Sequence, residues 1–309
     1  MTMRAQGPAF PRTALTVLRV GHCTHLECMA LRGGAWRKGV FPALVGLIRH
    51  PAAGAILFDT GYAEHFFAAT ARLPERMYRW ATPTVLPPSE CLGTQLARHG
   101  IAMHEVRAVF ASHLHADHIA GLRDLPRAAI WCADAAVRFA RTSGRIARLR
   151  RATLRALLPG DFAARHVAIE HLPRAPLPHA WRVLGEGHDL LGDGSLRALP
   201  LPGHARGHYG LLLRNQDDRE YLLAGDALWR YDATRGPLSP AWPVRLLADD
   251  WNALHATLTG LRAIHADGAG DDGDDDRDNE RRRDDGRCIL PSHCAASYAR
   301  LPDTVRGTP

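Results

Sequence analysis

The chain has 309 residues, of which 46% are hydrophobic, so it can form one large globular domain or two. No apolar run approaches the roughly 20 residues that span a membrane, and no secretory signal precedes Thr13, so we expect a cytoplasmic protein without a membrane span. The net charge of +7 favours anionic partners, but we expect no nucleic acid partner, because no DNA- or RNA-recognition motif is present.

The chain alternates between apolar runs and helix or strand breakers. The first part predicts strands at 13–20, 43–49 and 55–58, a helix at 62–73, a Pro-rich loop or lid at 74–89, a helix from Ser89 to Gly100 and a buried strand at 106–111. The rest predicts a short strand at 129–131, a helical segment at 133–158 broken at Gly144, a β-rich region at 166–226, a helix at 249–266, a strand at 288–290 and a helix at 295–300.

Two segments have unusual charge. Residues 267–286 hold ten acidic and four basic side chains and almost no apolar ones, which predicts a disordered acidic insertion. The helical segment at 133–158 carries seven arginines. A solvated helix face is the simpler interpretation of these arginines, and the alternative is a basic wall that attracts an anionic substrate to a pocket.

The segment His113-Leu114-His115-Ala116-Asp117-His118 places four metal-binding side chains directly after the buried strand at 106–111. In extended backbone His113 and His115 point to the same side, whereas the adjacent Asp117 and His118 must diverge. One metal ion can therefore take the first pair while a second ion takes the next pair.

Three further candidate ligands also stand where a predicted strand ends. They are His204 in a Gly-rich loop, Asp226 after an apolar run, and His293 after the last strand. Zn²⁺ favours imidazole nitrogen and carboxylate oxygen as ligands. The seven groups are enough for two metal ions, with one carboxylate shared between them.

Together these motifs resemble those of the metallo-β-lactamase-fold hydrolase superfamily. His-x-His-x-Asp-His is followed in order by Gly-His, Gly-Asp and Ser-His, and Leu57-Phe-Asp-Thr-Gly61 is similar to the superfamily's first motif. The resemblance implies an α/β fold of the α+β kind, a four-layer αββα sandwich. It also implies that residues 1–309 form one catalytic domain interrupted by the acidic insertion.

The same resemblance implies a role for each candidate residue. His113, His115 and His204 would hold one metal ion, and Asp117, His118 and His293 would hold the other. Asp226 would bridge the two ions. Asp59 would brace the ligand loops without binding metal itself.

Within the superfamily the chain most resembles the N-acyl-homoserine lactonase branch, which also implies a homodimer. That branch has a tyrosine three residues after the bridging aspartate, where this chain has Trp229; Tyr231 is a candidate replacement. Phe66 and Trp80, together with Trp229, are candidates for an apolar substrate pocket.

The implied reaction is hydrolysis of an ester or lactone by a hydroxide that bridges two metal ions. Asp117 or Asp226 would pass a proton to the leaving group. We expect two Zn²⁺, although the ligands also suit iron or manganese, and a small-molecule substrate that is acylated or anionic. The alternatives on this fold are a thioesterase of the glyoxalase II type and an iron-dependent oxidoreductase similar to persulfide dioxygenases.

Overall fold

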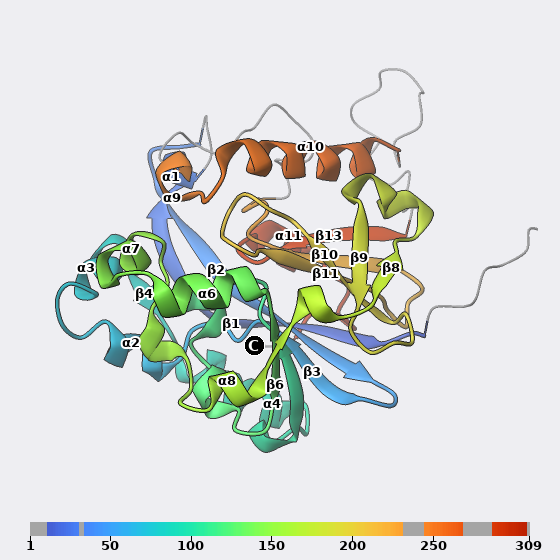
Figure 1. The fold of residues 1–309 in the computed structure, drawn as a ribbon, viewed down its shortest axis with the longest axis horizontal. Coiled ribbons are helices and arrows are strands. Elements are labelled where there is room, and N and C mark those ends of the chain that lie inside the picture. Colours follow the sequence, from blue (N-terminus) through green and yellow to red (C-terminus); the bar gives the residue numbers. More distant parts are fainter. Residues whose placement is uncertain (1–10, 31–33, 231–243, 268–285, 308–309) are drawn as a thin grey trace, which may run out of the picture.

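The computed structural model describes residues 11–30, 34–230, 244–267 and 286–307. Two β-sheets face each other, and helices cover their outer sides (Figure 1). This is the expected αββα sandwich. No helix among the described residues is both long enough and apolar enough to cross a membrane. The expected acidic insertion at 267–286 lies almost entirely outside the described residues.

The first sheet has seven strands and provides one side of the candidate metal site. Their order is β4 (Thr84–Val85), β1 (Ala14–Leu26), β2 (Lys38–His50), β3 (Gly54–Phe58), β5 (Val106–Phe110), β6 (Ala129–Cys132) and β7 (His166–Ala168). Strand β5 is parallel to β3 on one side and to β6 on the other. The carboxyl ends of β3 and β5 therefore meet at one edge of this sheet.

The second sheet has six strands and provides the other side. Their order is β13 (Arg287–Pro291), β12 (Glu220–Gly225), β11 (Tyr209–Arg214), β10 (Leu196–Pro200), β9 (Glu186–Asp189) and β8 (Arg174–Pro176). β11 is antiparallel to both β10 and β12, and β13 is parallel to β12. Strands β10, β12 and β13 consequently run in one direction, and their carboxyl ends share an edge.

Both faces of the second sheet are apolar because both are covered. On β11, Leu211 and Leu213 pack into the core between the sheets, whereas Leu212 packs into a second core on the outer face. This alternation follows the two-residue period of a strand. The outer core is closed by α10 (Trp251–Asp267), which contributes Leu254 and Leu258 and lies along the top of the sheet in Figure 1.

The remaining helices are short. The first sheet is flanked by α2 (Glu64–Ala69), α3 (Arg76–Ala81), α4 (Leu92–Arg98), α5 (Ala116–Ile119), α6 (Asp134–Thr142), α7 (Arg145–Arg150) and α8 (Phe162–Arg165). The others are α1 (Glu27–Ala30), α9 (Val244–Leu247) and α11 (Ala295–Ala299).

The structure differs from the sequence prediction in two helical regions. The predicted lid at 74–89 contains helix α3. The six residues of this helix lie between Pro74 and Pro83, so no proline interrupts it. The predicted helix at 133–158 breaks before Gly144, as expected, but α7 ends at Arg150. Ala152 then takes a positive φ of 50°, which no helix accommodates, and the chain turns so that Thr153 and Leu154 are buried.

Candidate metal centre

The turn after β5 separates its four polar side chains by a change of backbone conformation. His115 is extended, with φ −72° and ψ 154°, and α5 begins at the next residue. His113 and His115 therefore precede the helix, whereas Asp117 and His118 lie in its first turn. The strand-to-helix transition therefore separates the first pair from the second. Asp117 and His118, which the sequence predicts to diverge, instead lie together, with Oδ2 of Asp117 3.8 Å from Nε2 of His118.

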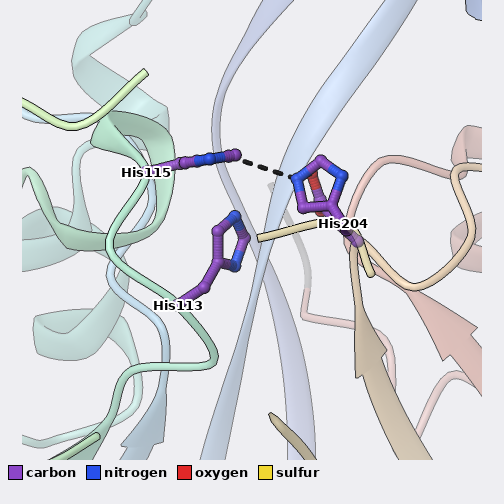
Figure 2. Close-up of side chains that lie close together, drawn as sticks. His113, His115 and His204 are labelled. Atoms are coloured by element: carbon purple, nitrogen blue, oxygen red, sulfur yellow. Dashed lines mark hydrogen bonds and ion pairs between the residues drawn. The ribbon is translucent and has the colours of Figure 1, made fainter. Parts of the chain in front are cut away.

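The seven candidate ligands gather into two groups where the edges of the two sheets meet. One group consists of His113, His115, His204 and Asp226, and the other of Asp117, His118 and His293. Within each group the potential ligand atoms all lie within 4.8 Å of one another. Figure 2 shows three members of the first group, with His115 Nδ1 and His204 Nε2 3.2 Å apart.

Asp226 lies between the two groups, and its two carboxylate oxygens face different ones. Oδ2 is 3.2 Å from Nε2 of His204, in the first group. Oδ1 is 3.3 Å from Nε2 of His118 and 3.2 Å from Nε2 of His293, both in the second group. A carboxylate oriented in this way can offer one oxygen to each of two metal ions.

Hydrogen bonds outside the groups fix the orientation of three of the rings. Nδ1 of His293 lies 2.7 Å from the carbonyl oxygen of Pro42, and Nδ1 of His118 lies 2.7 Å from Oδ2 of Asp59. Nδ1 of His113 lies 3.0 Å from the hydroxyl of Ser112. Each ring can therefore use Nδ1 for the protein and present Nε2 to the centre.

The inward-facing atoms fit a metal. Among the described residues, Nε2 of His113, Nε2 of His118 and Oδ1 of Asp226 are buried and make no hydrogen bond of good geometry, although Oδ1 of Asp226 lies 3.3 Å from Nε2 of His118. Such groups are costly to bury alone, because their water contacts are lost without replacement. Coordination of a divalent cation by imidazole nitrogen and carboxylate oxygen would satisfy all three.

The histidines of the centre differ in pKa because their surroundings differ. Burial lowers the pKa of both His113 and His115 well below the usual range, which keeps these rings neutral. Burial opposes the charged form of His118 as well, but the carboxylates of Asp59 and Asp226 raise its pKa to about 10. Because metal ligands must be deprotonated, a bound cation would displace the proton from His118.

Asp59 occupies a strained position directly after β3. Its φ of 61° lies in the left-handed region that residues other than glycine rarely adopt. Its carboxylate accepts hydrogen bonds from the backbone N–H of Ser112 at 2.8 Å and from the Ser112 hydroxyl at 2.9 Å, in addition to its contact with His118. Burial raises the pKa of Asp59, although these donors favour its charged form.

Two residues that hold the ligands were not assigned this role from the sequence. Ser112 joins Asp59 to His113, and its position directly before the first histidine is the only sequence signal for it. His208 links the loop before β11 to the turn after β12. Its Nδ1 lies 3.0 Å from the carbonyl oxygen of Leu201, and its Nε2 accepts a 3.0 Å hydrogen bond from the backbone N–H of Asp226.

The four side chains predicted to contact the substrate differ in their surroundings. The indole N–H of Trp229 donates to Oδ2 of Asp226 at 3.1 Å, so this ring belongs to the surroundings of the ligands. Phe66 is fully buried and packs against the rings of Tyr62 and Tyr78. Trp80 is 61% exposed. Tyr231 lies outside the described residues, and a substrate role for each of these side chains stays a prediction.

The profile of the metallo-beta-lactamase superfamily matches residues 39–293 of the chain. The chain belongs to this superfamily. The match begins in β2 and ends at His293, so it includes all seven candidate ligands. The chain is thus a metallo-hydrolase of the superfamily with a candidate metal site.

Two relatives match the chain in sequence, one over most of its length and one over less than half. A probable metallo-hydrolase of Mycobacterium tuberculosis is 26% identical over 261 residues, covering 82% of this chain and 74% of the relative. The N-acyl homoserine lactonase AttM of Rhizobium johnstonii is 30% identical over 142 residues, covering 45% and 47% of the two chains.

The fold is also that of solved lactonases. An AiiA mutant of B. thuringiensis with bound N-decanoyl-L-homoserine superimposes with a TM-score of 0.65, at 16% identity, over 95% of this chain and 98% of that one. The dizinc quorum-quenching lactonase AidC gives a TM-score of 0.58 at 13% identity, over 94% and 90% of the two chains. At such identities the likeness shows the fold alone.

Proposed function

We propose that the protein is a dinuclear metal-dependent hydrolase that opens a lactone or cleaves an ester. The observation that carries this proposal is the orientation of Asp226, whose two oxygens face separate groups of ligands. One ion would be held by His113, His115 and His204, and the second by Asp117, His118 and His293. Asp226 would bind both ions, as a shared carboxylate does in two-metal sites.

Two zinc ions, when bound, would supply a hydroxide at neutral pH and polarise the substrate carbonyl. The protein contributes orientation, because Asp59, Ser112 and the carbonyl of Pro42 hold the histidine rings by Nδ1. Asp117 is less deeply buried than Asp226, and its Oδ2 lies 3.2 Å from Nε2 of His293. We assign to Asp117 the transfer of a proton: its carboxylate would accept the proton of the attacking hydroxide and pass it to the leaving alkoxide.

A lactone is the substrate class that we favour. The support comes from the lactonase AttM among the relatives and from the lactonases that share the fold. Trp229 sets this chain apart from the lactonase pattern, because its N–H is directed at the carboxylate of Asp226. We therefore expect carbonyl contacts to come from the metals and from other donors, and the acyl preference to differ.

The test combines metal analysis with a substrate panel on one sample. Protein purified without chelators is analysed by ICP-MS and assayed on N-acyl-homoserine lactones, simple lactones, aryl esters and thioesters. We expect about two metal ions per chain and turnover of a lactone. Asp226→Asn should lose both, whereas Asp303→Asn, at an aspartate whose side chain is 90% exposed and pairs with Arg306, should lose neither.

Other outcomes discriminate between the candidate functions. Turnover confined to thioesters would replace the lactone by a thioester as substrate. One iron per chain, with oxygen consumption and no hydrolysis, would overturn the hydrolase and favour an oxidoreductase on this fold.

A further inference from the structure

A cavity of about 410 Å³ lies beside the metal centre, between α2 with the turn after it and the segment from α7 to Ala156. Its apolar wall is made by small side chains of α2 and by Leu149 and Leu154. Its polar wall is made by Arg72, Arg145, Arg148 and Arg155, with Glu75 as the only acidic residue among those lining it. The volume is typical of a site for a small molecule.

The charges in this cavity do not balance. Glu75 is paired with Arg145, whose Nε and Nη2 donate to its two carboxylate oxygens at 2.6 Å each. Arg72, Arg148 and Arg155 form no salt bridge with a carboxylate of the described residues, although the charge of Arg148 also helps to lower the pKa of Glu75 below its usual value, after the hydrogen bond from Arg145. Arg148 donates to the backbone carbonyl of Ser143. The guanidinium groups of Arg72 and Arg155 form no hydrogen bond or ion pair with any other described residue.

Arg72 and Arg155 are exposed and Arg148 is half-buried, so water screens part of the repulsion among these three guanidinium groups, and an anion bound between them would offset the rest. Guanidinium groups bind phosphate and carboxylate through paired N–H donors, and a concave wall strengthens the field. A surplus of three positive charges fits a multiply charged phosphate better than a single carboxylate. We propose that this cavity binds the phosphate group of a small molecule.

The cavity adjoins the metal-binding turn. Thr153 lines both the cavity and a smaller hollow that contains His115 and His204. The residue before it, Ala152, accepts a 3.0 Å backbone hydrogen bond from Ala116, which lies between His115 and Asp117. The phosphate can therefore belong to a substrate that reaches the metals or to a separate effector bound next to them. Both sources share the chemistry that the arginines recognise.

The test is direct binding of pyrophosphate to the metal-loaded protein by calorimetry, in the unaltered chain and in two double variants. Arg72→Ala with Arg155→Ala removes the two unpartnered guanidinium groups of the cavity. Arg98→Ala with Arg107→Ala removes two exposed arginines elsewhere as a matched control. We expect the first pair to weaken pyrophosphate binding by roughly tenfold per arginine, and the control to leave it unchanged.

Pyrophosphate can also bind the metals, and the design separates the two sites. If the Arg72 and Arg155 variant binds pyrophosphate with the affinity and stoichiometry of the unaltered protein, the binding belongs to the metal centre and the proposal is wrong. Equal weakening in both double variants would also overturn it, since it would show a general charge effect. This measurement does not depend on lactone hydrolysis.

A kinetic arm distinguishes the two sources of phosphate once binding at the cavity is established. If the phosphate belongs to the substrate, pyrophosphate should compete with a phosphorylated ester, and the Arg72 and Arg155 variant should raise KM for that ester alone. If it belongs to an effector, pyrophosphate should change kcat for a neutral lactone, and the variant should abolish this change.

Discussion

At the scale of single residues, Trp229 adds a hydrogen bond to the candidate metal centre. A tyrosine at this position could offer a hydroxyl to a substrate, as the lactonase pattern implies. The indole N–H instead donates to Oδ2 of Asp226, the oxygen that faces His204, and the ring lies 5.9 Å from the His204 ring. Trp229 therefore restrains the carboxylate that we propose as the bridge.

We expect Trp229→Phe to weaken metal binding by about tenfold, because phenylalanine keeps an aromatic ring but loses the N–H that orients Asp226. Competitive titration with a chromophoric chelator measures this affinity. Trp36→Phe is the control, since Trp36 is 87% exposed. Unchanged affinity in Trp229→Phe would show that the hydrogen bond to Asp226 does not support the metal.

At the scale of elements, the end of β12 is shaped by a glycine that no other residue can replace without strain. Gly225 has a φ of 56°, and a Cβ there would lie 2.6 Å from Nε2 of His208. That same Nε2 accepts the backbone N–H of Asp226. The turn thus delivers Asp226 to the centre only if position 225 has no side chain.

We expect Gly225→Ala to destabilise the protein by about 2–4 kcal/mol, the sum of left-handed strain and of the clash with His208. Denaturant unfolding measures the loss, and ICP-MS should show less bound metal. Gly100→Ala separates the two causes. Its φ is also positive, at 71°, but its Cβ would meet no atom within 4 Å, so we expect a loss of only about 1 kcal/mol. Equal losses in the two variants would argue against the clash.

At the scale of the whole molecule, the centre connects the two sheets. His113 and Asp59 follow strands of the first sheet, whereas Asp226 and His293 follow strands of the second. Backbone hydrogen bonds also cross between them, from Leu44 to the carbonyl of Ser292 at 2.9 Å. We propose on this basis that the chain forms one catalytic unit, because neither sheet holds a complete ligand set.

Removal of metal should therefore destabilise the whole protein. At a metal concentration 100-fold above Kd, binding adds about 2.7 kcal/mol to the stability of the folded state. We expect chelation to lower Tm by at least about 5 °C, measured by calorimetry, and zinc to restore it. A Tm that is the same with and without metal would mean that the ligand groups do not hold a cation in the folded protein.

The sequence alone determined the fold family and pointed to the candidate ligands, because the signal for each candidate is local. Each of His113, His204, Asp226 and His293 ends or follows an apolar strand, and such ends can be recognised without knowing which strands pair. Only the tertiary structure decided that the oxygens of Asp226 divide between two groups, that Ser112 and His208 hold the ligands, and that unpartnered arginines line a cavity. These features depend on residues far apart in the chain, whose distances are set when the two sheets pack together.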